Sequence, residues 1–580
     1  MVASIGYDST LHRVLEIPEI IELVFGFLDE ESNRTNVCVC KRWSEIALDV
    51  LWREVSQLHR LLRLLSPFIT EDSPYFYMAF AKPLSPDDWR RFTRYARRVR
   101  KLSFTNGKTV HVLGQAVFDE IARTRTTLNI LPNLQSLEWR STPANVRVSL
   151  MFMHEGVKEF RTHLYETPIY SIADFFKDIA ERMPNLTCLD LCFCFPVREI
   201  ESALCELVRS LPKLSKIVLP LYCHNSRVAE ALSALQHLGT IQFEYLSEQG
   251  KGDLADVQHF APMLERGAFP SLCDLSLSAH LADMNRFLKG TYAPTNLTSL
   301  YIHALSMVPP AVVTEFLKTM VENCKLLTHL YLDLHMAADL IDSATRSLPP
   351  SEMLSFNDLR PLLACPKLIA FELQWYLPLL ITQEEIEELA SKWPDLEVLE
   401  LDCEPIPIPI ATEPLTLRAL IPFAKHCPKL RELGLFVSAT SADLDAFSHE
   451  TNSPFMQPFR QLKKLCFGLS SITEPGPVAL FLSELCPLGC KLSAGLSWQD
   501  DLEQVENTAF SEELSQRGPE WYDRWLEVDR VLPLLTRLRM EERERRRVLE
   551  CEVEDLRVRC RVLEERATLP MSVDSSCLVL

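Results

Sequence analysis

One short pattern returns along most of this 580-residue chain and constrains its fold more than any other feature. The pattern is L-x-x-L-x-L, often preceded by proline, as in LPNLQSLEW (131–139), WPDLEVLEL (393–401) and CPKLRELGL (427–435). Its recurrence about every 30 residues is the signature of a solenoid built from stacked units. The first apolar position of each unit falls at residues 99, 134, 157, 186, 214, 238, 272, 297, 327, 368, 396, 430 and 462.

Each unit combines two periodicities. Alternation with a period of two places the leucines of L-x-L on one face of a short strand. The stretch before a strand has helical spacing instead: Ile172, Phe175 and Ile179 share one face, and Thr382 with Glu385 has the spacing of a capping box. Proline then ends the helix. We therefore predict an α/β fold, a horseshoe with parallel strands inside and helices outside.

The segment 17–55, IPEIIELVFGFLDEESNRTNVCVCKRWSEIALDVLWREV, has a different pattern. Ile20, Val24 and Leu28 lie on one helical stripe, and a second apolar cluster follows around Trp43. A three-helix unit of about 40 residues exposes much of its apolar surface unless a partner covers it. The pattern thus favours a docking module.

This segment closely resembles the F-box, through which F-box proteins bind the Skp-type adaptor of an SCF (Skp, cullin, F-box) ubiquitin ligase. It departs from the motif in two places. IPEI lacks the residue usually found between proline and glutamate, and Asn33, Arg34 and Asn36 replace common apolar residues. Carried over residue by residue, the resemblance assigns adaptor binding to Ile17, Pro18, Glu19, Ile20, Val24, Phe25, Leu28, Val39, Cys40 and Trp43.

The repeats resemble the leucine-rich repeats of many F-box proteins, and DDWRRFTRYARRVRKLSF (87–104) is similar to the joining segment of a large fungal, basidiomycete-like F-box group. The asparagine expected after L-x-L is mostly missing, so we expect an irregular arc. The resemblance implies a substrate receptor without an active site or cofactor of its own, linked through the adaptor to a cullin-RING ligase. The alternative is a non-catalytic leucine-rich-repeat scaffold whose degenerate F-box takes no part in ubiquitination.

The residues between the leucines are expected to face the concave surface of the horseshoe. Aromatic side chains beside carboxylates suit a basic, lysine- or arginine-rich segment of an unknown protein substrate. The alternative is that the acidic residues only keep an exposed strand wall soluble. The candidate substrate-binding residues are Tyr301, His303, His329, Tyr331, Asp333, Glu372, Glu400, Asp402 and Phe436.

The repeat is lost after about residue 498, and residues 520–567 predict a charged helix. The residues at heptad-compatible positions are Leu535, Leu538, Leu549, Leu556 and Leu563, but the other seam positions hold Glu542, Arg545, Glu552 and Arg559. This favours a solvated helix that lies against the last repeat over a coiled coil. The expected organisation is a flexible N-terminus (1–14), the F-box (15–65), a linker and connecting helix (66–98), the solenoid (99–498), a C-terminal helical region (499–567) and a disordered tail (568–580).

Charge and composition exclude several classes of function. The net charge of -19, from 79 acidic and 60 basic residues, repels a phosphate backbone and disfavours nucleic acid as a partner. The start of the chain lacks the layout of a secretory signal, so we expect a cytoplasmic or nuclear protein whose 18 cysteines are thiols. The sequence contains no cysteine and histidine pairs at the spacing of zinc ligands and no glycine-rich phosphate loop. We therefore expect no bound metal and no cofactor.

The last four residues, CLVL, form a C-a-a-X box of the geranylgeranyl type. This motif predicts prenylation of Cys577, and the attached lipid would associate the protein with a membrane. The preceding LPMSVDSS supplies no polybasic patch as a second membrane signal. The alternative is a tail that ends in this word by chance.

Overall fold

The computed structural model describes residues 15, 17–70, 77–105, 112–167, 169–244, 248–334, 353–405, 414–440, 457–495 and 509–568. The chain divides into two compact units. The N-terminal unit comprises Met1–Ser306 and Glu315–Leu327, and the C-terminal unit comprises Met307–Thr314 and Thr328–Leu580. The expected flexible N-terminus and the tail with Cys577 lie outside the described residues.

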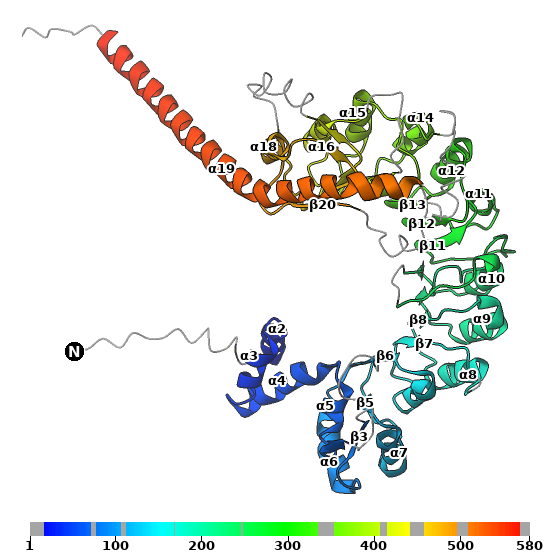
Figure 1. The fold of residues 1–580 in the computed structure, drawn as a ribbon. Helices are drawn as coiled ribbons and strands as arrows, with labels where there is room; N and C mark the ends of the chain where they lie inside the picture. Colours follow the sequence, from blue (N-terminus) through cyan, green and yellow to red (C-terminus); the bar gives the residue numbers. More distant parts are fainter. Residues whose placement is uncertain are drawn as a thin grey trace, which may run out of the picture. The chain divides into compact units, whose positions relative to one another are not determined.

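The N-terminal unit opens with the three predicted helices, α2 (Pro18–Gly26), α3 (Glu30–Asn36) and α4 (Lys41–Arg53), drawn in dark blue in Figure 1. Asp29 caps α3 by accepting a hydrogen bond from the Ser32 backbone N–H at 2.8 Å. The small core contains Ile21, Phe25 and Ala47. The three-helix unit expected from the sequence is confirmed, and we refer to α2, α3 and α4 as the F-box helices.

Parallel strands follow in the order of the sequence, each paired with the next. In the N-terminal unit they are β1 (Glu54–Val55), β4 (Lys101–Thr105), β6 (Ser136–Arg140), β7 (Glu159–His163), β8 (Cys188–Cys192), β9 (Lys216–Val218), β10 (Thr240–Gln242), β11 (Asp274–Ala279) and β12 (Ser299–Ala304). From β4 onward each strand begins two residues after a predicted first apolar position. In β12, Leu300 and Ile302 are fully buried whereas Tyr301 and His303 are half-buried, so the predicted alternation is present.

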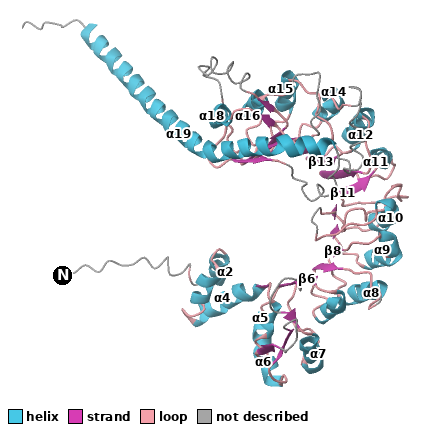
Figure 2. Ribbon diagram, in the orientation of Figure 1, coloured by secondary structure: helices cyan, strands magenta, loops and turns pink. Residues whose placement is uncertain are grey.

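Helices and short 3-10 turns precede most of these strands and form the second layer of the unit (Figure 2). They are α7 (Gln115–Thr124), η1 (Pro143–Met151), α8 (Ile172–Arg182), η2 (Val197–Glu199), α9 (Glu201–Ser210), α10 (Ser226–Ser233), η3 (Leu254–Asp256) and α11 (Leu281–Lys289). α8 buries Phe175, Phe176 and Ile179, the face that its spacing predicts. α12 (Pro310–Asn323) contains residues of both units.

Between the F-box helices and the repeats the chain is more ordered than a linker. α5 (Leu58–Leu62) is followed by β2 (Phe68–Thr70), β3 (Tyr77–Phe80) and α6 (Pro86–Ala96). β2 and β3 form a small sheet with β5 (Val112–Leu113), which comes after β4 in the chain. Phe68 and Phe80 face each other across β2 and β3 with ring centroids 5.1 Å apart. β1 already pairs with β4 in parallel, so the sheet begins inside the segment assigned to the F-box.

The C-terminal unit repeats the same architecture. Its parallel strands are β13 (His329–Asp333), β14 (Ala370–Gln374), β15 (Val398–Leu401), β16 (Glu432–Leu435), β18 (Lys464–Gly468) and β20 (Lys491–Ala494), with a separate pair of β17 (Ser438–Ala439) and β19 (Ser471–Ile472). The helical layer consists of α14 (Phe356–Leu359), η6 (Arg360–Ala364), α15 (Gln383–Lys392), η7 (Leu417–Ala419), α16 (Leu420–His426) and α18 (Pro475–Leu485). The predicted capping box of Thr382 and Glu385 opens α15.

The unit ends in α19 (Ala509–Thr568), a 60-residue helix that begins before the predicted residue 520. Trp525, Val528 and Leu532 of α19 are buried, and the Trp525 ring stacks on Phe467 of β18 with centroids 4.1 Å apart. The early half of α19 therefore lies against the last repeat, as expected. Beyond it, every residue from 541 to 564 is exposed.

Candidate functional site

The F-box helices carry an exposed apolar surface, which we call the docking face. It consists of Ile17, Leu23, Val24, Phe27, Leu28 and Val39. Phe27 is 84% exposed and Leu23 63% exposed, values that are unusual for large apolar side chains in a folded module. A cluster of exposed large apolar side chains within one small helical unit is typical of a protein-binding site.

Most of the predicted adaptor residues lie at the surface. Ile17, Pro18, Glu19, Val24, Leu28, Val39 and Cys40 are exposed, and Ile20 is half-buried. Phe25 is only 3% exposed, and its ring packs edge-on against Trp43 at a centroid distance of 5.4 Å. The structure therefore places this predicted adaptor residue inside the helical unit rather than on the docking face. Phe25 belongs to the core, against which the half-buried Trp43 packs.

Sequence reasoning missed Leu23 and Phe27. They are four residues apart and lie beside the predicted stripe, so α2 and the turn after it are apolar over more than one face. A helix that is apolar on several sides is buried on several sides. A three-helix unit is too small to bury both apolar faces of α2, so one face is left for a binding partner. Apolar residues on a second face of α2 are thus the sequence signal that would have identified Leu23 and Phe27.

Asn33, which departs from the F-box pattern, has an internal role. Its side chain is 2% exposed and donates hydrogen bonds to the carbonyl oxygens of Phe25 at 2.8 Å and Leu28 at 3.3 Å. These bonds satisfy backbone groups left over where α2 ends. The substitution thus fixes the turn that presents Phe27 and Leu28.

Ion pairs attach the F-box helices to α6 and the residues just after it. Arg98, with a side chain only 9% exposed, pairs with Glu45 and Asp49 of α4, and Arg94 contacts Glu45 at 2.9 Å. Arg98 also donates to the Glu45 carbonyl oxygen at 2.9 Å. A guanidinium that bridges several acceptors fixes orientation better than a single exposed pair.

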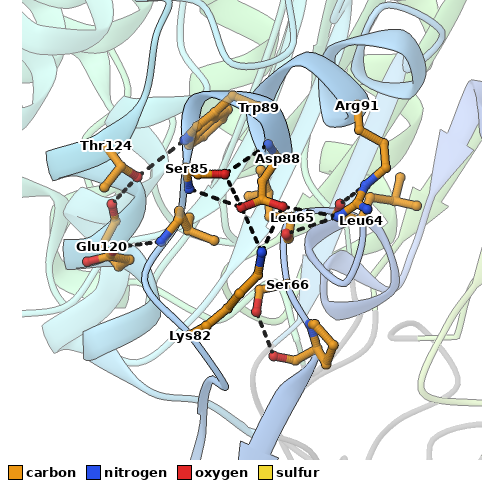
Figure 3. A network of polar contacts seen from close by, with 12 residues as sticks. Leu64, Leu65, Ser66, Lys82, Ser85, Asp88, Trp89, Arg91, Glu120 and Thr124 are labelled. Atoms are coloured by element: carbon orange, nitrogen blue, oxygen red, sulfur yellow. Dashed lines mark hydrogen bonds and ion pairs between the residues drawn. The ribbon is translucent and has the colours of Figure 1, made fainter.

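A polar network at the start of α6 continues this attachment into the repeats (Figure 3). Asp88 accepts hydrogen bonds from Ser85, which lower the pKa of Asp88 to about 2, and from Lys82 at 3.1 Å. Arg91 donates to the Leu64 carbonyl oxygen at 3.0 Å. The Trp89 indole N–H donates to Thr124 of α7 at 3.3 Å. The docking face is therefore fixed to the first repeats by paired polar groups.

In the C-terminal unit, polar side chains form a row along the strand face. Tyr331, Glu372 and Glu400 occupy aligned positions on β13, β14 and β15. Burial and the negative charge of Glu400 raise the pKa of Glu372 to about 7. Lys464 of β18 approaches Glu400 at 3.1 Å. The row combines an aromatic ring with carboxylates, as expected for a site that takes a basic segment.

Two predicted members of this surface are buried instead. Asp402 is 2% exposed because β15 ends at Leu401 and Asp402 adopts a φ of 46°, which breaks the alternation. Its Oδ1 accepts the Trp375 backbone N–H at 3.1 Å, and burial raises its pKa well above the usual range. Asp333 is 8% exposed. Both carboxylates are therefore buried, in contrast to the exposed positions that the strand pattern predicts.

The remaining candidates are half-buried. His329 stacks near Tyr331 at a centroid distance of 6.5 Å, and Phe436 follows the end of β16. Tyr301 and His303 belong to the N-terminal unit, where Tyr301 packs against Phe243 at 5.2 Å. The structure thus brings together Tyr331, Glu372 and Glu400 but assigns Tyr301 and His303 to a separate unit.

A small pocket of about 120 Å³ opens beside the carboxylate row. Its lining includes Gln374, Glu400, Glu404 and Lys464, together with Asp402, whose Oδ2 is buried with no hydrogen-bond donor among the described residues. The carboxylates of Glu400 and Glu404 in this lining suit the end of a cationic side chain. Sequence reasoning did not find it, because it brings together residues of β14, β15, β18 and β20 with residues that follow the end of β15.

Within the described ranges, no group of three or more histidine, cysteine, aspartate or glutamate side chains could hold a metal ion. None of the helices in that part of the chain is long and apolar enough to cross a membrane.

Comparison with known proteins identifies the first segment. Residues 18–58 match the model of the F-box-like family, and they contain the whole of α2, α3 and α4. The chain therefore has an F-box-like domain followed by leucine-rich-repeat-like units and a long C-terminal helix. No curated protein matches it.

Among solved structures, the chain is similar to one in a complex of Rad7 and Elc1 from yeast, with 17% identity, a TM-score of 0.34, and coverage of 60% of this chain and 80% of that one. A leucine-rich-repeat protein of Legionella pneumophila, LegL7, gives 13% identity, a TM-score of 0.28, and coverage of 54% and 87%. A TLR13–ssRNA13 complex gives 15% identity, a TM-score of 0.28, and coverage of 70% and 58%.

Proposed function

We propose that this protein is the substrate receptor of an SCF-type ubiquitin ligase, acting in the cytoplasm or nucleus. The F-box-like domain binds a Skp-type adaptor through the docking face, and the repeats bind the protein to be ubiquitinated. The observation that carries this proposal is the exposed apolar surface around Leu23 and Phe27, within the segment that matches the F-box-like family.

The mechanism is one of effective concentration rather than catalysis. One contact recruits the ligase and another holds the substrate, so the substrate's lysines spend more time near the ubiquitin-loaded enzyme. Transfer chemistry belongs to other subunits of the ligase. The ion pairs of Arg98 and the network around Asp88 support this mechanism, because they keep the docking face fixed to the first repeats.

We further propose that the row of Tyr331, Glu372 and Glu400 binds a lysine- or arginine-rich segment of the substrate. The aromatic ring supplies apolar contact, and the carboxylates and the adjacent pocket accept a cationic side chain. Lys464 neutralises part of this surface through Glu400, which limits the strength of non-specific attraction.

The proposal is tested by affinity purification of the tagged full-length chain from cells in which the proteasome is blocked. We expect the adaptor, a cullin and the substrate to co-purify. Tyr331→Ala should remove the substrate and leave the adaptor, whereas Phe27→Glu should remove adaptor and cullin and leave the substrate. Tyr301→Ala measures whether the N-terminal unit also contributes to capture.

Two outcomes would contradict the account. If the wild-type chain captures substrate but no adaptor or cullin, it is a leucine-rich-repeat scaffold with a degenerate F-box. If Tyr331→Ala and Tyr301→Ala both leave substrate capture unchanged, the strand face is not the substrate surface.

A further inference from the structure

The last part of α19, from about residue 544, extends past the ion pairs that hold α19 against α18 among the described residues. The last ion pair between α19 and α18 joins Arg543 to Glu484 at 2.8 Å. From there to residue 564 every side chain is exposed, and the ion pairs of this stretch connect residues of α19 itself. Figure 1 shows this part of α19, in red, projecting beyond α18.

Apolar residues nevertheless form a continuous seam along this solvated stretch. Leu549, Val553, Leu556, Cys560 and Leu563 are spaced by 4, 3, 4 and 3 residues. This is the spacing of alternating d and a positions in a coiled coil, with leucine at d. The leucines are 59%, 58% and 63% exposed, and Val553 is 46% exposed. A helix that is solvated on all sides is expected to be polar on all sides, so an apolar seam indicates a contact with another helix.

The charges beside the seam are complementary between two parallel copies of the same helix. In a parallel pair, the g position of one helix faces the e position five residues later on the other. Each such combination in this stretch is attractive. The facing residues are Arg545 with Glu550, Glu552 with Arg557, and Arg559 with Glu564.

The overall charge of the stretch removes the main obstacle to self-association. Residues 544–564 contain six acidic and six basic side chains, so their net charge is zero although that of the whole chain is -19. Two copies of the stretch therefore approach without net repulsion. The existing ion pairs within α19 are exposed, such as Arg559 with Asp555 at 2.8 Å, and weak enough to rearrange.

We propose that residues 544–564 form a parallel two-stranded coiled coil with a second copy of this chain. Leucine at d with a β-branched residue at a favours two strands, and the paired charges set the register. The protein is then a dimer that presents two F-box-like domains and two sets of repeats. This differs from the heptad assignment made from Leu535 and Leu538, which places Glu552 and Arg559 in the seam.

A matched pair of valines tests the seam. Val553 and Val558 are on the same exposed helix and are 46% and 48% exposed, but only Val553 lies in the seam. By light scattering at micromolar concentrations, the wild-type chain should have about twice its 66.4 kDa mass. Val553→Glu should give the monomer mass, and Val558→Glu should remain dimeric. A monomeric wild type, or the same mass for both variants, would overturn the proposal.

A matched pair of cysteines tests the orientation. Cys560 lies in the seam and Cys551 faces away from it, and both are exposed. In a parallel dimer the two Cys560 thiols meet, so diamide, which takes up the two thiol hydrogens, should link them as a disulfide. Cys551→Ser should still cross-link and Cys560→Ser should not. A dimer in which Cys560→Ser changes nothing would refute the parallel arrangement.

Discussion

At the scale of single residues, fewer carboxylates are available on the strand face of the C-terminal unit than its acidic sequence suggests. Glu372 is kept partly neutral near pH 7 by burial and by Glu400, while Asp402 is folded inward to accept the Trp375 N–H. Only some carboxylates of the acidic pattern are therefore available to a partner. The residue at which each strand ends determines which carboxylates remain accessible.

The raised pKa of Glu372 predicts a pH dependence of binding. Its folded-state pKa of about 7 lies above the ordinary 4.5, so the neutral form is favoured in the folded chain. Ionisation through pH 7 adds negative charge beside Glu400, Glu432 and Lys464. A lysine-rich peptide should bind on the order of tenfold more tightly at pH 8 than at pH 6. Fluorescence titration checks this, and Glu372→Gln should flatten the dependence.

The same shift affects stability in the opposite direction. Between pH 4.5 and about 7 the folded chain binds more protons than the unfolded chain at this residue, so the contribution of Glu372 to stability falls as the pH rises.

A peptide affinity that is independent of pH in the wild type would contradict the role of Glu372 in binding.

At the scale of elements, the repeated pattern located each of the thirteen predicted strands, because L-x-L alternation directly reflects burial on one face. Among the strands of the long parallel sheet it missed β1, which is two residues long, and β20, where Leu492 is the only large apolar residue. Both are end strands whose pairing depends on neighbours rather than on a pattern of their own. Phe25 was assigned to the docking face because spacing alone does not tell which side of a small helical unit is its core.

The attachment of α4 to the segment after α6 is an element-level property that mutation can test. Arg98→Ala removes charge-assisted bonds from a side chain that is 9% exposed, and should destabilise this contact by about 2 kcal/mol. Hydrogen exchange of α4 amides should then be roughly 30-fold faster. The control is Arg90→Ala, since Arg90 is 79% exposed and should have little effect.

Equal exchange rates of α4 in the Arg98→Ala and Arg90→Ala proteins would show that apolar packing alone holds the F-box helices. The contact of Trp52 with Tyr95, at a centroid distance of 5.4 Å, would then be the principal attachment.

At the scale of the whole molecule, the proposals rest on three surfaces of different chemistry. They are the docking face, the row of Tyr331, Glu372 and Glu400, and the exposed seam of α19. All three contain side chains that the described parts of the chain leave at least partly accessible. The repeats could be predicted because their periodic apolar residues are the ones that become buried. The three surfaces could not be predicted fully, because they consist of side chains whose exposure depends on the folded structure.

Direct titration of a purified Skp-type adaptor against the full-length chain tests the central claim. The wild type should bind, and Phe27→Glu should weaken binding at least 30-fold, as for a side chain central to an interface. Leu128→Glu provides the control, because Leu128 is 71% exposed but lies outside the docking face. Binding that is absent in the wild type, or equal in the two variants, would contradict the assignment of this surface to the adaptor.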